Sequence, residues 1–231
     1  MPYSFVDSVY TSGDGGGWTM KRLSRAVALI LLVASFPSGA GGDSGLRRPR
    51  PTSLFDGTSL AGWEGKLDLW TIEGGELVGR MRNFDRCEFL RHTKVLSDFR
   101  LIVEVKLLND QGDSGLMFRS EVTADGDMPG YQADVGQNRW GGLLVRSNQR
   151  YFNALGSASV NLRDWNTYEI LAVGDRIQLA LNGKSCCDIE NPHGPRSGRI
   201  GLQLNTWAPI EVRFRKFQLE TDPKPVLKTV K

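Results

Sequence analysis

Apolar and polar positions alternate most regularly over residues 99–108. Phe99, Leu101, Val103 and Val105 are separated by mostly polar residues, and a period of two places all four on one face of a β-strand. The intervening positions are mostly polar, so the other face should be wet or partly wet. The pattern predicts a core strand of an antiparallel sheet.

Similar short runs, separated by Gly, Asn and Asp turns, recur along the chain, which contains 27 glycines. They predict strands at 69–72, 76–80, 87–91, 99–108, 115–119, 131–135, 165–173, 176–181, 199–204 and 210–219. Gly-Gly at 74–75, Gly-Asp at 174–175 and Asn-Gly at 182–183 are typical hairpin turns. The last strand slips in register after Phe214, which indicates a β-bulge. The sequence therefore predicts an all-β two-sheet antiparallel sandwich or concanavalin-like jelly roll, with a closed barrel as the alternative.

Residues 20–40 have the organisation of a signal peptide. Three basic residues are followed by an apolar run over 26–36 and by the small residues Ser-Gly-Ala, which predict cleavage near Ala40. This run is shorter than the roughly 20 residues of a membrane-spanning helix, which disfavours the alternative, a membrane anchor. We therefore expect residues 1–19 to be a mis-called start and the chain to be exported, to the periplasm or the extracellular space.

The Pro- and Gly-rich segment 41–52 is expected to be a flexible linker. The remaining length suits one domain, over 53–220, followed by a C-terminal tail at 221–231. The chain has 29 basic and 26 acidic residues; cleavage removes three basic and two acidic ones, which leaves a net charge of +2. This balance predicts no general attraction to nucleic acid, or to a membrane after signal cleavage.

Three cysteines leave at least one thiol unpaired in an exported chain. A disulfide between Cys87 and either Cys186 or Cys187 is expected, and a vicinal bond or three buried thiols are the alternatives. His92 and His193 are the two histidines, and His92 should lie on the strand face opposite Cys87. Neither a Ser-His-Asp set nor a His, Cys and Asp cluster at ligand spacing is present, which disfavours triad chemistry and structural zinc.

Residues able to carry chemistry are densest between 109 and 150. Along the strand that starts at Tyr131, Gln132 and Asp134 share one face. Together with Arg119 on a neighbouring strand, they would form a polar cluster that a sheet does not need for stability. The simpler interpretations are that Arg119 is a surface charge paired with a nearby glutamate, and that Asp134 anchors a turn.

Side chains around this face could hold a sugar. Trp140 precedes two glycines and could stack on a pyranose ring, or it could be a core residue near a glycine bulge. Gln203 and Asn205 share one face of a late strand and could line the same concave surface. The predicted substrate-binding residues are Tyr131, Trp140, Arg146, Gln203 and Asn205.

A divalent metal ion is a further candidate cofactor. Carboxylate and amide oxygens that could bind calcium are supplied by Asn109, Asp110, Asp113, Asp125 and Asp127. They lack the fixed spacing of a calcium loop. The sequence therefore names no set of metal ligands.

Seven ordered motifs resemble the 3-keto-disaccharide hydrolase domain family. They are LFDG at 54 with LAGW at 60, DFRL at 98, DSGLMFR at 113, GYQAD at 130, WNTYEI at 165, LNG at 181 and GRIGLQ at 198. The resemblance spans roughly 53–220. It implies a concanavalin-like jelly roll, an exported location and activity on sugars oxidised at C3.

The chemistry implied by this resemblance begins with the C3 ketone, which acidifies the proton on C2. A general base removes that proton, the C1 substituent is expelled, and water adds back. In the family a Glu usually follows Gly-Tyr and a Gln stands two places later, whereas this chain has Gln132 and Asp134. Asp134 is displaced by two residues on the same face, so it is the expected base.

The enolate needs a cation or positioned donors, and Arg119, with or without a metal ion, is expected to supply them. Gln132 is the third expected catalytic residue. A separate sugar dehydrogenase would have to supply the 3-keto-glycoside. The alternative function is a non-catalytic concanavalin-like carbohydrate-binding domain that uses the same concave sheet.

Overall fold

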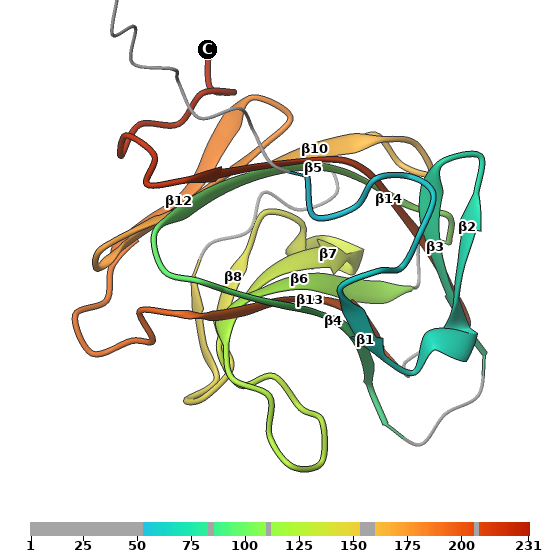
Figure 1. The fold of residues 1–231 in the computed structure, drawn as a ribbon. Helices are drawn as coiled ribbons and strands as arrows, with labels where there is room; N and C mark the ends of the chain where they lie inside the picture. The colour runs from blue at the N-terminus through green and yellow to red at the C-terminus, as the bar shows by residue number, and fades with distance from the viewer. Residues whose placement is uncertain (1–52, 83–85, 110–111, 153–159, 206–207) are drawn as a thin grey trace, which may run out of the picture. The chain divides into compact units, whose positions relative to one another are not determined.

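The alternating segment at 99–108 forms strand β5, Phe99–Leu107, at the centre of one of two antiparallel sheets (Figure 1). The computed structural model describes residues 53–82, 86–109, 112–152, 160–205 and 208–231. All of them lie in one compact unit, Leu46–Lys231. The predicted start, signal peptide and linker, over 1–52, lie outside the described residues.

Among the described residues, each sheet has seven strands. Sheet A has the order β12 (Lys184–Glu190), β11 (Arg176–Leu181), β10 (Asn166–Val173), β5, β14 (Ile210–Thr221), β3 (Glu76–Met81) and β2 (Trp70–Glu73). Sheet B has the order β1 (Trp63–Gly65), β4 (Glu88–Leu96), β13 (Gly198–Leu204), β6 (Asp113–Ser120), β7 (Tyr131–Gly136), β8 (Leu143–Val145) and β9 (Arg150–Phe152). Two 3-10 turns, η1 (Leu67–Leu69) and η2 (Gln137–Arg139), join strands.

The inward faces of the two sheets share one hydrophobic core. Phe99 and Val103 of sheet A and Leu116 and Phe118 of sheet B are fully buried in it. Phe99 and Phe118 meet edge to face across the sheets, with ring centroids 6.1 Å apart. The described strands form two separate sheets, so the sandwich prediction is confirmed and the barrel alternative is wrong.

The predicted irregularity in the last strand is confirmed. The pairing of β14 with β5 shifts between Arg215 and Gln218. Lys216 has a positive φ of 54° inside this bulge. The shift keeps Phe214 and Phe217, which are three residues apart, both buried in the core.

The predicted disulfide is wrong. Cys87 immediately precedes β4 in sheet B, whereas Cys186 and Cys187 lie on β12, the far edge strand of sheet A. All three residues are described, and no disulfide joins any of them. A register shift opposite Leu179 and Ala180 lets both adjacent cysteines enter the core. Burial raises the pKa of Cys186 to about 12 and that of Cys187 to about 11, so both thiols stay protonated.

The C-terminal tail is fastened to the outer face of sheet A. Arg100 and Glu169 are buried there, with Nε of Arg100 2.8 Å from Oε1 of Glu169. Arg100 also donates from Nη2 to the carbonyl oxygens of Lys224 and Val226. Glu169 in turn accepts hydrogen bonds from the backbone N–H groups of Lys228 and Thr229. The tail therefore completes the hydrogen bonding of a buried ion pair.

In the part of the chain that the structure describes, no helix is long and apolar enough to cross a membrane.

Candidate functional site

Strand β7 places the two predicted polar residues on the outer face of sheet B. Tyr131, Ala133 and Val135 point into the core, so the intervening Gln132 and Asp134 point outward. Nε2 of Gln132 lies 2.5 Å from Oδ1 of Asp134. The predicted sharing of one face by these two side chains is confirmed.

The strands on either side of β6 complete a group that we call the outer polar cluster: Asp113, Gln132, Asp134, Gln203 and Asn205. Nε2 of Gln132 also donates to Oε1 of Gln203, at 3.2 Å, and Nδ2 of Asn205 donates to Oδ2 of Asp113, at 2.9 Å. All five side chains are buried. The structure therefore brings together four predicted site residues from two distant segments, and adds Asp113.

Gly115 makes room for this cluster. It pairs with Asp134 across β6 and β7. A Cβ atom at Gly115 would lie 2.7 Å from Cγ of Gln132, closer than side chains approach one another. The glycine of the DSG motif thus lets the Gln132 side chain lie flat across β6 toward Gln203.

The two carboxylates of the cluster have unsatisfied oxygen atoms. Oδ1 of Asp113 and Oδ2 of Asp134 are buried and accept no hydrogen bond from the described residues. Desolvation, together with the charge of Asp113, raises the pKa of Asp134 to about 7, although Arg139, Gln132 and Tyr151 oppose the shift. Burial also raises the pKa of Asp113, against the effect of Arg139. Two buried carboxylate oxygens beneath the outer face therefore have unused capacity to accept hydrogen bonds.

Two arginines and a tyrosine border the cluster. Arg139, at the end of η2, forms an ion pair with Oδ2 of Asp113. Nη1 of Arg146 donates to Oε1 of Gln132 at 3.3 Å, and the Tyr151 hydroxyl donates to the Arg139 carbonyl at 3.2 Å. Burial and the charge of Asp134 raise the pKa of Tyr151, which remains a neutral donor. These groups can offer positive charge and a hydroxyl to a ligand at the cluster.

Arg119 does not join this group, so the predicted cluster of Arg119, Gln132 and Asp134 is wrong in that member. Its backbone has a φ of +45°, and β6 gains a residue relative to β13 at this point. The bulge ends the alternation, and the guanidinium group is directed to the Ser97 and Gly174 carbonyls and to Oδ1 of Asp98. Arg119 therefore fixes two turns.

Tyr131 and Trp140 also lie away from the outer face. Tyr131 stacks on Phe118, with centroids 5.2 Å apart, and its hydroxyl accepts a hydrogen bond from Asn191. Trp140 is buried in the core and stacks on Tyr168 at 6.3 Å. The interpretation of Trp140 as a core residue is thus the one that the structure supports, and neither ring is free to stack on a sugar.

Three residues of the site were not among the predicted site residues. Asp113 could have been found by extending the two-residue period of β6 back from Gly115, since both face outward. Arg139 follows a turn in which Gly136 and Gln137 both have positive φ, and no periodicity extends through such a turn. Tyr151 lies on the short edge strand β9, which forms a local hairpin with β8, and neither of these three-residue strands is among those that the sequence predicts.

The described residues provide no evident set of ligands for the predicted metal ion. Within the described ranges, no group of three or more His, Cys, Asp or Glu side chains could hold a metal ion. Asp113 pairs with Arg139, and the Asp125 carboxylate accepts from Thr123. Asp110 lies outside the described residues. A divalent ion at this site remains a prediction.

Solved structures with this fold come from several proteins. A protein from Parabacteroides distasonis ATCC 8503 assigned as a glycosyl hydrolase is 20% identical, with a TM-score of 0.57, over 74% of this chain and 98% of that one. A Bacillus subtilis protein of unknown function with a galectin-like fold is 12% identical, with a TM-score of 0.54, over 70% of this chain and 90% of that one. At these identities the likeness shows the fold, and it confirms the predicted jelly roll.

A sequence comparison identifies the family. Among curated proteins, none matches this chain significantly. The model of one family, described as the 3-keto-alpha-glucoside-1,2-lyase-like domain, matches residues 50–220. This span includes all seven sequence motifs and every residue of the outer polar cluster, and it confirms the resemblance seen in the sequence. The chain therefore belongs to the 3-keto-alpha-glucoside-1,2-lyase-like domain family.

Proposed function

We propose that this chain is an exported enzyme that cleaves 3-keto-glycosides, with Asp134 as the general base. The observation that carries the proposal is the unpartnered Oδ2 of Asp134, a buried carboxylate oxygen on the outer face of a domain of this family. A pKa of about 7 suits a group that must take up a proton and release it near neutral pH. Gln132 orients this carboxylate through its hydrogen bond to Oδ1.

The reaction uses one water molecule and returns the base to its starting state. Oδ2 of Asp134 takes the C2 proton, and the C–H electrons form an enolate with the C3 carbonyl group. The enolate collapses, a C1–C2 double bond forms, and the bond from C1 to the substituent oxygen breaks. Water gives its proton to the departing oxygen and its hydroxide to C1, while Asp134 returns a proton to C2. The guanidinium groups of Arg139 and Arg146 are the nearby positive charges that favour the enolate.

Aglycone release from a panel of glycosides tests this proposal. The purified protein is incubated with 3-keto-glucosides and with their unoxidised parents, with and without a chelator. Release only from the keto forms is expected, because only the ketone acidifies C2; loss of release with the chelator would add a metal ion. Absence of release, together with binding of a plain glycan, would replace the proposal by the carbohydrate-binding alternative.

The proposal includes a place in a reaction sequence and in the cell. An enzyme that oxidises the C3 hydroxyl of a glycoside must supply the substrate, so a sugar dehydrogenase is the expected functional partner. Export by the signal peptide at 20–40 is expected to leave a secreted protein that begins just after Ala40. Sequencing of the N-terminus of the secreted protein tests this, and retention of Met20 would contradict it.

Turnover is expected to rise with pH and to level off above about pH 7, because the base must be ionised to accept the C2 proton. Below that value, kcat/KM should fall about tenfold for each pH unit. The measurement is the pH profile of kcat/KM for a substrate with a neutral aglycone. A profile that is flat from about pH 5 to about pH 8 would exclude Asp134 as the base.

A further inference from the structure

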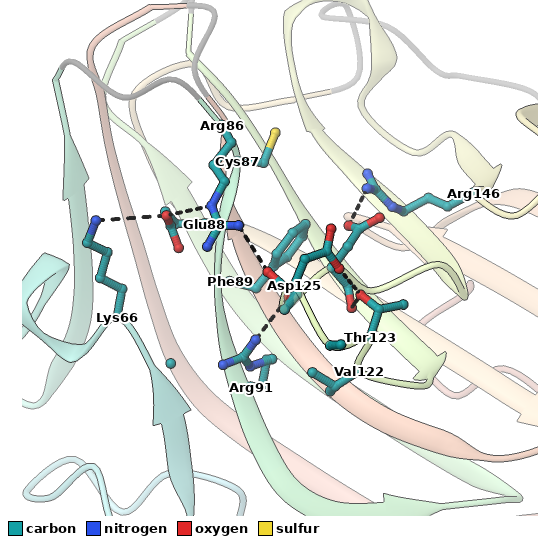
Figure 2. A pocket seen from close by; sticks show the side chains of 14 residues that line it. Lys66, Arg86, Cys87, Glu88, Phe89, Arg91, Val122, Thr123, Asp125 and Arg146 are labelled. Carbon is teal, nitrogen blue, oxygen red and sulfur yellow. Dashed lines mark hydrogen bonds and ion pairs between the residues drawn. The ribbon is translucent and has the colours of Figure 1, made fainter.

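A separate pocket adjoins the outer polar cluster. It has a volume of about 630 Å³ and is open to solvent between the start of β4, the loop over 122–127 and Lys66 (Figure 2). Arg146 joins the two sites: its Nη1 contacts Gln132 in the cluster, and its Nη2 lies 2.7 Å from Oδ1 of Asp127 on the pocket wall. A group bound in the pocket can therefore contact Arg146, which also binds Gln132, the hydrogen-bond partner of Asp134.

The register of sheet B places the pocket in line with the cluster. Arg91 on β4 pairs with Gly201 on β13, Gly201 pairs with Met117 on β6, and Met117 pairs with Gln132 on β7. Three steps between neighbouring strands span about 14 Å. A ligand that lies over both of these backbone positions must be longer than one pyranose ring, as a sugar with a further ring as its C1 substituent is. The apolar cluster of Phe89, Met117 and Met128 lies along this line.

Most charged side chains around the pocket form ion pairs with one another, but Arg91 does not. Its basic side chains are Lys66, Arg86, Arg91 and Arg146, and its acidic side chains are Glu88, Asp125 and Asp127. Oε1 of Glu88 lies 3.9 Å from Nζ of Lys66 and 3.4 Å from Nε of Arg86. Asp127 forms an ion pair with Arg146. Arg91 forms no ion pair with the described residues: Nη1 donates to the Gly126 carbonyl at 2.9 Å, and Nε is buried without a hydrogen bond. One guanidinium group in the pocket thus lacks a carboxylate.

We infer that this pocket binds the C1 substituent of the substrate and selects one that carries an anionic group, a carboxylate or an ester sulfate. The inference rests on the proposed function, because the leaving group is defined by the reaction at Asp134. Arg91 is the specificity residue, since its planar fork can bind such a group through two parallel hydrogen bonds. Phe89 provides an apolar surface on the pocket wall, and the Arg146 guanidinium lies 5.5 Å from its ring centroid.

Matched substrates test the inference. A 3-keto-glucoside with glucuronate as its C1 substituent is compared with the same compound bearing glucuronamide, which has nearly the same shape without the charge. We expect kcat/KM to favour the glucuronate about tenfold, as for a charge-assisted hydrogen bond. A sulfated hexose in place of glucuronate shows which anion is preferred.

Variants assign the preference to Arg91. Arg91→Gln is expected to bring the ratio close to one by slowing only the charged substrate, and Arg91→Lys should retain part of the preference. Lys94→Gln is the matched control, because Lys94 is an exposed cation on the same strand and does not line the pocket. A ratio of one in the parent protein, or a ratio that Arg91→Gln leaves unchanged, would overturn the inference and leave the proposed function standing.

Binding measurements separate this inference from the proposed reaction. If neither keto-glycoside is turned over, the unoxidised glucosyl-glucuronate and glucosyl-glucuronamide are titrated against the protein by calorimetry. Tighter binding of the glucuronate, abolished in Arg91→Gln and retained in Arg91→Lys, would support the anionic pocket although the reaction had failed. Equal binding of the two compounds would overturn it.

Discussion

Asp134→Asn is expected to lower the turnover of 3-keto-glycosides by about 10²- to 10⁴-fold, which is the usual contribution of a positioned general base. The amide has the same shape as the carboxylate but cannot take up the C2 proton. Because asparagine keeps one side-chain oxygen, it can still accept the hydrogen bond that Nε2 of Gln132 donates. Sugar binding should therefore survive, and the loss should appear in kcat with little change in the dissociation constant of a non-reactive glycoside.

The same substitution should not weaken the fold, and this separates catalysis from stability. The folded pKa of Asp134, about 7, is above the unfolded value of an aspartate, about 3.9. Burial thus favours the protonated form, and the free energy of unfolding falls as pH rises from about 4 to about 7. Asn removes this penalty, so the variant should match or exceed the parent's melting temperature at pH 8. Such a gain at the expense of activity is common at functional sites.

The control for this experiment is Asp188→Asn. Asp188 is an exposed aspartate on β12 of sheet A, where it pairs with Arg176. Its loss should leave turnover unchanged, because an exposed pair is worth little and lies on the other sheet. If Asp134→Asn kept full turnover, Asp134 would not be the base. A lower melting temperature at pH 8 in this variant but not in Asp188→Asn would contradict the expectation that burial of the Asp134 carboxylate weakens the fold.

The sequence predicted the parts of this structure that depend on local rules. The period of two in β5 and β7 gave the correct inward and outward faces, and the dipeptide turns gave the correct hairpins. Gln203 and Asn205 were correctly predicted to share one face, since Gln203 lies on β13 and Asn205 directly follows the last residue of that strand. These predictions needed no knowledge of which strands are neighbours.

The parts that could not be predicted depend on backbone irregularities or on long-range pairing. By the alternation of β6, Arg119 should face the outer side of the sheet, but its own left-handed backbone conformation turns its side chain away. No residue type near Arg119 in the sequence predicts that conformation. Arg139 and Trp140 lie in a turn where polar and apolar residues follow no regular period. The directions of their side chains therefore depend on how the turn packs against the rest of the fold. The pairing of β13 with β4 and β6, which are far apart in sequence, is what brings Gln203 to Gln132.

Glu169→Gln is expected to destabilise the protein by about 3–5 kcal/mol, the usual cost of breaking a buried ion pair. Glu169 is fully buried and accepts hydrogen bonds from Arg100, from two backbone N–H groups of the tail and from the Thr229 hydroxyl. An amide leaves Arg100 with Glu220 as its remaining carboxylate partner and turns one acceptor into a donor. The melting temperature should fall by about 10 °C or more, as measured by calorimetry.

The tail supplies the second half of this experiment. A chain that ends after residue 223 loses the carbonyl and N–H groups that surround the pair, and should also be destabilised. Since both changes disrupt one network, their effects should be less than additive when combined. Glu121→Gln, at an exposed position, should change the free energy of unfolding by less than about 0.5 kcal/mol. Additive losses would show that the tail and Glu169 act separately.

Glu169 belongs to the WNTYEI motif. Sub-additive losses would therefore show that this part of the family resemblance reflects a structural anchor on sheet A, remote from the chemistry at Asp134 on sheet B.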